Sequence, residues 1–123
     1  MTLKGRIERE KKVDQLLGEA DRRLTAAEKA VTGEESWTNC QEAVKQLLLA
    51  LLVAKEENAP PEHNLNLTLL WEKCLLMDPE LLLLTDCLRI FQEEPNRFEN
   101  GDLLIEAANE VWDYIYGVLT EET

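Results

Sequence analysis

The sequence predicts an all-α protein, a five-helix and mainly up-and-down bundle. Apolar residues recur at spacings of three and four through five segments of the chain, which is the period of one face of an α-helix. No segment alternates apolar and polar residues in the way that is typical of a strand. The 123 residues fit one domain, residues 1–123, which is long enough to bury a core without disulfides.

A helix-capping pattern separates the first two predicted helices. The first is expected over about residues 4–31, with the apolar stripe Val13, Leu17, Ala20, Leu24, Ala27 and Val31. Thr32 and Glu35 then form a capping box, because each side chain can accept a hydrogen bond from the other residue's backbone N–H. The second helix begins there and presents the seam Trp37, Cys40, Val44, Leu47, Leu51 and Ala54.

The second helix contains the stretch LLLALLVA, residues 47–54, which is apolar on all sides. A helix covered on one side only would expose part of this stretch to water. The helix is therefore central in the bundle, or part of it meets a second subunit, and the two alternatives are compatible. We expect a homodimer.

The third and fourth helices follow from turn and cap signals. Pro60 and Pro61 lack backbone donors, so the second helix ends before them. The third helix is expected over about residues 65–77, with one side formed by Leu67, Leu70, Trp71 and Cys74. Asp78 followed by Pro79 is a start signal for a fourth helix over about residues 79–93. Its stripe is Leu81, Leu84, Leu88 and Phe91.

The fifth helix is expected over about residues 102–120, after a loop that contains Pro95 and Gly101. Its apolar face is Leu104, Ala108, Val111, Ile115 and Val118. Short connections between neighbouring helices complete the predicted bundle.

Charge and cysteine usage limit the classes of partner and compartment. The formal net charge of −12 repels polyphosphate, which argues against sequence-independent nucleic-acid binding, and DNA is not an expected partner. No apolar run reaches the roughly 18 residues that a membrane span needs, and the first residues lack the apolar stretch of a secretion signal. Cys40, Cys74 and Cys87 are odd in number and lie in apolar patterns, so we expect reduced core thiols. These features predict a cytoplasmic protein without membrane contact.

The single histidine, His63, lies in the stretch NAPPEHNL, residues 58–65. A di-metal carboxylate site needs a Glu-x-x-His pair, but Pro60 stands three residues before this histidine. Cysteine or serine catalysis needs a histidine oriented by a third group, and a proline turn gives no sign of one. We therefore predict no catalytic residue, no metal site and no cofactor, and the sequence favours a non-enzyme. His63 is interpreted as a turn marker.

Four short stretches, taken in order, resemble a HEPN domain (higher eukaryotes and prokaryotes nucleotide-binding) over about residues 13–119. The stretches are NCQEAVKQLLLALLVA, EHNLNLTLL, NRFEN and DLLIEAANEVWDYI. Related small prokaryotic members have a second helix that reads like AEKALKALL, a following turn like THDL, and RYP before the last helix. Here CQEAVKQLL, EHNL and RFE stand in those places. Lys45 takes a lysine position of the family pattern, whereas Gln41 and Glu42 depart from it.

The resemblance implies one of two activities. Many HEPN domains are metal-independent ribonucleases whose motif is an arginine followed by about four to six residues and then a histidine, arranged across a dimer. The matching positions before His63 are Glu56, Glu57 and Asn58, so that motif is absent. Other members are non-catalytic partners or substrate-binding halves of minimal nucleotidyltransferases. This branch implies a nucleotidyltransferase partner protein or a nucleotide ligand, bound with contributions from Lys45, His63, Asn64 and Arg97.

Two alternatives to that function stay open. A degenerate ribonuclease toxin would cleave RNA and lose the activity on His63→Ala or Arg97→Ala. An interaction-only antitoxin or scaffold would show no nucleotide-dependent thermal shift. A structural interpretation also competes for each candidate residue: His63 and Asn64 as turn and cap groups, Lys45 as a solvent-facing lysine, and Arg97 in a loop ion pair.

Overall fold

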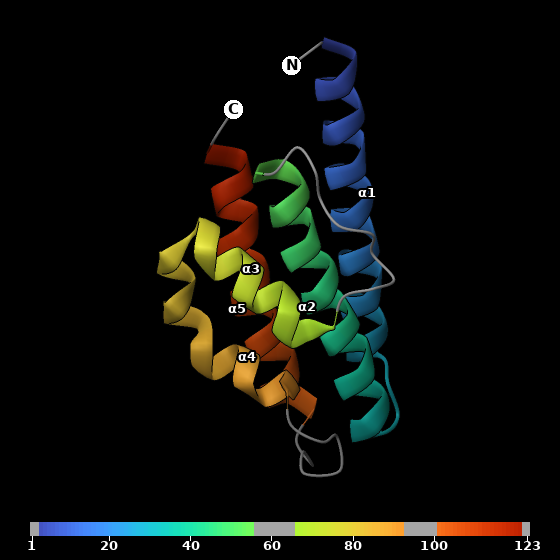
Figure 1. Cartoon of the computed structure of the whole chain (residues 1–123). Helices are drawn as coiled ribbons and strands as arrows, with labels where there is room; N and C mark the ends of the chain where they lie inside the picture. The colour runs from blue at the N-terminus through green and yellow to red at the C-terminus, as the bar shows by residue number, and fades with distance from the viewer. Residues whose placement is uncertain (1–2, 56–65, 93–100, 122–123) are drawn as a thin grey trace.

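The structure, a computed structural model, describes residues 3–55, 66–92 and 101–121 (Figure 1). Within these ranges the chain forms five α-helices and one 3-10 helix, without a strand, which confirms the predicted all-α bundle. In chain order the elements are α1 (Leu3–Glu28), α2 (Gly33–Lys55), α3 (Leu67–Met77), η2 (Pro79–Leu84), α4 (Thr85–Gln92) and α5 (Gly101–Glu121).

Three long helices and one short hairpin make up the bundle. Helix α1 runs antiparallel to α2 and α5, and α2 lies between them (Figure 1). The α3–η2–α4 hairpin lies obliquely across α2 and α5, with its turn at the edge of the molecule farthest from α1 (Figure 1). The arrangement is therefore mainly up and down, with one tilted pair.

The turn between α1 and α2 contains the predicted cap with one change. The Thr32 hydroxyl oxygen accepts a hydrogen bond from the Glu35 backbone N–H, 3.1 Å from oxygen to nitrogen. The Glu35 carboxylate accepts from the N–H of Val31, at 3.4 Å, one residue earlier than the capping box predicts. Helix α1 ends at Glu28 instead of about residue 31, so Val31 is 92% exposed and its assignment to the α1 stripe was wrong.

The buried stripe of α1 differs from the predicted one at a second position. Its buried members are Leu16, Ala20, Leu24 and Ala27. Leu16 was not predicted, and it lies four residues before Ala20, on the same helix face. Val13 and Leu17 pack at the margin of the core and stay half-buried.

Helix α2 is the centre of the core. All six residues from Leu47 to Leu52 are buried, and α2 contacts α1, α3, α4 and α5. The all-round apolar stretch is therefore covered inside one chain, which confirms a central position. No second subunit is required to cover this helix, so its apolar stretch does not support the expected homodimer. The homodimer stays a prediction.

The hairpin follows the predicted apolar pattern and departs from it in helix type. The four predicted residues of α3 are buried: Leu67, Leu70, Trp71 and Cys74. The predicted fourth helix divides into η2 and α4, but its four stripe residues, Leu81, Leu84, Leu88 and Phe91, are buried as expected.

Asp78 joins three elements at the turn of the hairpin. Its backbone N–H donates to the Cys74 carbonyl at the end of α3, at 2.8 Å. Its Oδ1 atom accepts from the Glu80 N–H at the start of η2, at 3.2 Å, which confirms the predicted start signal. Its Oδ2 atom accepts from the Tyr114 hydroxyl of α5, at 2.9 Å. One side chain therefore ties the turn to the bundle.

Helix α5 covers α2 with the predicted face. Leu104, Ala108, Val111 and Ile115 are buried, and Val118 is half-buried near the end of the helix. Ala107 adds a buried position that was not predicted.

Candidate functional site

Lys45 is the one predicted site residue that lies within the described residues. It is half-buried on α2, and its Nζ atom lies 3.5 Å from Oε1 of Glu42, one turn earlier on the same helix. An ion pair of this spacing on a partly exposed helix stabilises that helix by roughly 0.2–0.5 kcal/mol. The geometry therefore gives Lys45 a local partner on its own helix.

His63, Asn64 and Arg97 lie outside the described residues, in the segments 56–65 and 93–100. Their predicted convergence with Lys45 is therefore untested, and so is the interpretation of His63 as a turn marker.

The neighbours of Lys45 on α2 have a structural role that the sequence did not reveal. Gln41 Nε2 donates to the Phe91 carbonyl at 2.8 Å, and Trp37 Nε1 donates to the Ile90 carbonyl at 3.4 Å. Carbonyls in the last turn of a helix have no partner inside the helix, so these two side chains satisfy the end of α4. Gln41, which departs from the family pattern, therefore acts as a C-terminal cap for another helix.

The three cysteines form no disulfide, and two of them have a raised pKa. Cys40 and Cys74 are buried and Cys87 is half-buried, in line with the predicted reduced thiols. Burial raises the pKa of Cys40 to about 11. Burial and the hydrogen bond to Glu110, at 2.8 Å, raise the pKa of Cys87 to about 12. A thiolate is the nucleophile in cysteine chemistry, so neither group is set up for catalysis.

Three exposed leucines lie at the turn of the hairpin. We call Leu76, Leu82 and Leu83 the leucine corner; they are 86%, 61% and 82% exposed. They lie within eight residues, on the end of α3 and on η2. The predicted stripe of the fourth helix contains Leu81 and Leu84 and leaves these leucines unassigned. The leucine run itself does not decide that Leu82 and Leu83 are exposed, because α2 buries a run of similar composition at every position.

An acidic helix face lies beside the leucine corner. Glu106, Glu110 and Asp113 are exposed on α5 and are spaced four and three residues apart, so they form one stripe. Asp102 extends it by one turn. Helix α5 contains neither lysine nor arginine, so the carboxylates of this face have no cation on their own helix. We call this set the acidic stripe.

The described residues contain neither a metal site nor a membrane-spanning helix, and the chain matches no known relative. Among the described residues, no group of three or more His, Cys, Asp or Glu side chains is placed to hold a metal ion. The helices within the same ranges include none with the length and apolar character that a membrane crossing requires. No family model, curated protein or solved structure matches the chain. The site is therefore argued from its own residues.

Proposed function

We propose that this chain is a non-catalytic, HEPN-like helical module that binds a partner protein through the leucine corner. The observation that supports the proposal most directly is the exposure of Leu76, Leu82 and Leu83 in a helical protein that buries its other long leucine run. Large apolar side chains gathered on one part of a surface mark protein-binding sites more often than single exposed ones do.

The energy available at this surface is sufficient for association. Full burial of a leucine side chain contributes roughly 1.5–3 kcal/mol relative to its exposed state. The turn that holds these residues is fixed by hydrogen bonds of Asp78 to α3, η2 and α5. A fixed binding surface loses less conformational entropy on association, so more of the burial energy appears as affinity.

The resemblance to HEPN domains supplies the more specific part of the proposal. It names a minimal nucleotidyltransferase as the partner and a nucleotide as a ligand near Lys45. A homodimer also belongs to this part. A cytoplasmic location fits three cysteines that form no disulfide, because thiols persist in reducing compartments.

Co-expression tests the proposed function. In this test the chain is produced with an affinity tag, and the protein encoded by the neighbouring reading frame is produced without one. We expect the two proteins to purify together from the wild type. The double variant Leu82→Ser and Leu83→Ser should lose the untagged protein, because it removes both apolar side chains of η2 from the surface.

Val31→Ser is the matched control. Val31 is 92% exposed in the turn between α1 and α2, on a different part of the chain. Its replacement removes exposed apolar surface without touching the leucine corner, and co-purification should be unchanged. Equal loss from both variants, or co-purification that survives the double variant, would contradict the assignment of the surface.

A further inference from the structure

The hairpin that carries the leucine corner is bonded to α5, which carries the acidic stripe. Two side-chain hydrogen bonds connect them: Tyr114 to Asp78, at 2.9 Å, and Cys87 to Glu110, at 2.8 Å. In the sequence these contacts lie on either side of Leu82 and Leu83. Element η2, which carries both leucines, therefore lies between two points at which the hairpin contacts α5.

The sequence order brings Leu82 and Leu83 close to this contact region. Leu83, on η2, lies four residues before Cys87 on α4. The Cys87 thiol contacts Glu110, which is itself a member of the acidic stripe. Leu82 is 61% exposed and Leu83 is 82% exposed. The two exposed leucines and the carboxylates therefore lie on neighbouring elements, apolar on the hairpin and anionic on α5.

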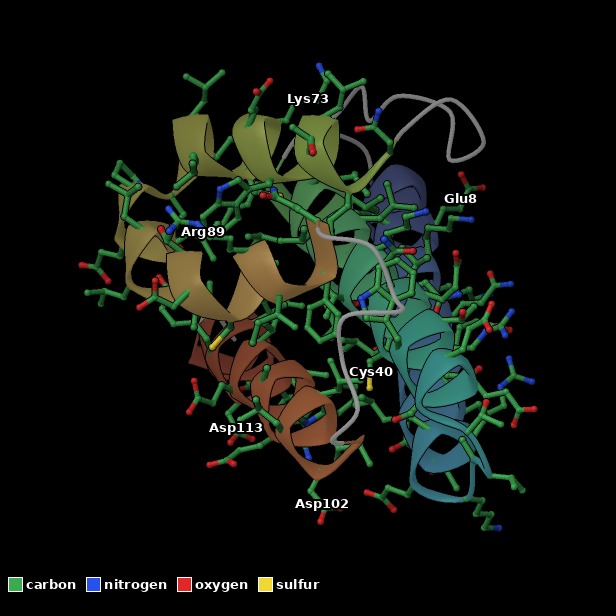
Figure 2. All side chains as sticks on the ribbon, turned by 90° about the horizontal axis from the view of Figure 1, so that it is seen from below. Glu8, Cys40, Lys73, Arg89, Asp102 and Asp113 are labelled. Atoms are coloured by element: carbon green, nitrogen blue, oxygen red, sulfur yellow. The ribbon has the colours of Figure 1, made fainter. Side chains whose placement is uncertain are left out.

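The basic residues of the hairpin lie on other sides. Figure 2 shows Lys73 projecting from α3 at the side of the molecule opposite Asp113 of α5. Arg89 is two residues after Cys87, so it lies on the opposite flank of α4, and Figure 2 places it between α3 and α4. Neither cation neutralises the acidic stripe.

From these positions we infer that the surface binds a cationic amphipathic helix of a partner protein. Its apolar side would cover Leu82 and Leu83, and its lysines or arginines would lie along Glu106, Glu110 and Asp113. The inference rests on the proposed function and names the chemistry of its partner. A second copy of this chain fits poorly, because each copy has a formal charge of −12 and the same carboxylates would meet.

A designed peptide tests the inference directly. The probe is a fluorescent helix of about 18 residues with leucines at helical spacing and lysines elsewhere. A second peptide has glutamate in place of each lysine, and a third scatters the same leucines and lysines without a stripe. Fluorescence anisotropy at about 50 and about 200 mM salt measures binding. We expect the first peptide to bind at least about tenfold more tightly than either control.

Two sets of variants separate the apolar and the ionic contributions. The double variant Leu82→Ser and Leu83→Ser should weaken binding of the first peptide by about tenfold or more at both salt concentrations. The pair Glu106→Gln and Asp113→Asn should weaken it mainly at low salt and reduce its salt dependence. Val31→Ser should bind as the wild type does. Equal binding of the lysine and glutamate peptides, or no effect of the leucine variants, would overturn the inference.

The outcomes also distinguish this inference from the proposed function. If the neighbouring protein co-purifies through Leu82 and Leu83 while the lysine peptide does not bind, the module binds a partner of different chemistry and the inference alone fails. If sedimentation shows a dimer that the double leucine variant dissociates, a second copy occupies the surface and the inference is wrong. Loss of both co-purification and peptide binding would reject both.

Discussion

Two leucine-rich runs of this chain have similar composition and opposite surroundings. LLLALL, residues 47–52 of α2, is buried at all six positions. ELLLLT, residues 80–85 of η2 and the start of α4, buries Leu81 and Leu84 and leaves Leu82 and Leu83 exposed. Helix α2 has neighbours on several sides, whereas η2 lies at the edge of the bundle. The position of a helix in the bundle, more than its composition, decides whether such a run becomes core or surface.

The largest expected effect comes from shortening a leucine of the buried run. Leu51→Ala should lower the free energy of unfolding by about 2–5 kcal/mol, because it removes buried methyl groups and leaves a cavity where α2 is covered all round. Chemical denaturation followed by far-UV circular dichroism measures this change. A loss below about 1 kcal/mol would mean that the run is covered less completely than the structure shows.

The second prediction concerns the ionisation of the Cys40 thiol, which is buried on α2. The pKa of Cys40 is raised by burial from 9.0 to about 11. Below pH 9.0 both the folded and the unfolded thiol are protonated, so the stabilisation from the raised pKa is fully present. Above it the unfolded thiol ionises first, and unfolding becomes easier until the folded thiol ionises too. We expect a loss on the order of 2–3 kcal/mol across this window.

Cys40→Ala isolates that contribution. The variant has no thiol to ionise at this position, so its stability should fall less between pH 9.0 and about pH 11 than that of the wild type. Urea denaturation at several pH values compares the slopes, which do not depend on the stability that the substitution itself removes. Parallel slopes would show that Cys40 is not protected from ionisation in the folded protein.

The third prediction concerns the contact of α2 with the end of α4. Gln41→Ala removes the hydrogen bond to the Phe91 carbonyl and should destabilise the protein by about 1 kcal/mol. Amide exchange should rise most in α4, whose last turn loses its partner. Glu42→Ala is the control, because Glu42 lies on the same helix and pairs with Lys45 without contacting α4. An equal rise in exchange from both variants would contradict the capping role of Gln41.

The smallest expected effect completes the comparison of the two leucine runs. Leu83→Ala should change the free energy of unfolding by less than about 0.5 kcal/mol, because an exposed side chain loses little packing when it is shortened. The same denaturation experiment as for Leu51→Ala gives the value. A loss of about 2 kcal/mol would mean that Leu83 is packed inside the protein and is not part of a binding surface.

The sequence predicted the parts of the fold that depend on local spacing. Leu67, Leu70, Trp71 and Cys74 were assigned to one side of a helix and are buried together. Asp78 and Pro79 were assigned to a helix start and occupy one. Both results depend on contacts within a few residues, where the helical period and the capping rules apply.

The parts that the sequence did not predict depend on contacts between distant segments. Gln41 and Phe91 are 50 residues apart, so no local rule relates the side chain to the carbonyl that it satisfies. The exposure of Leu82 and Leu83 depends in the same way on where the hairpin lies relative to α2 and α5. Of the predicted site residues, Lys45 was placed by a family pattern, and the structure gives it an ion pair with Glu42.

The hydrogen bonds of Asp78 to α3, η2 and α5 have a kinetic consequence for any complex formed at the hairpin turn. Since this carboxylate and its N–H hold α3, η2 and α5 together before a partner arrives, the surface has no rearrangement to complete during docking. The rate of capture should then follow diffusion and electrostatic attraction between the two molecules, and it should fall as ionic strength rises.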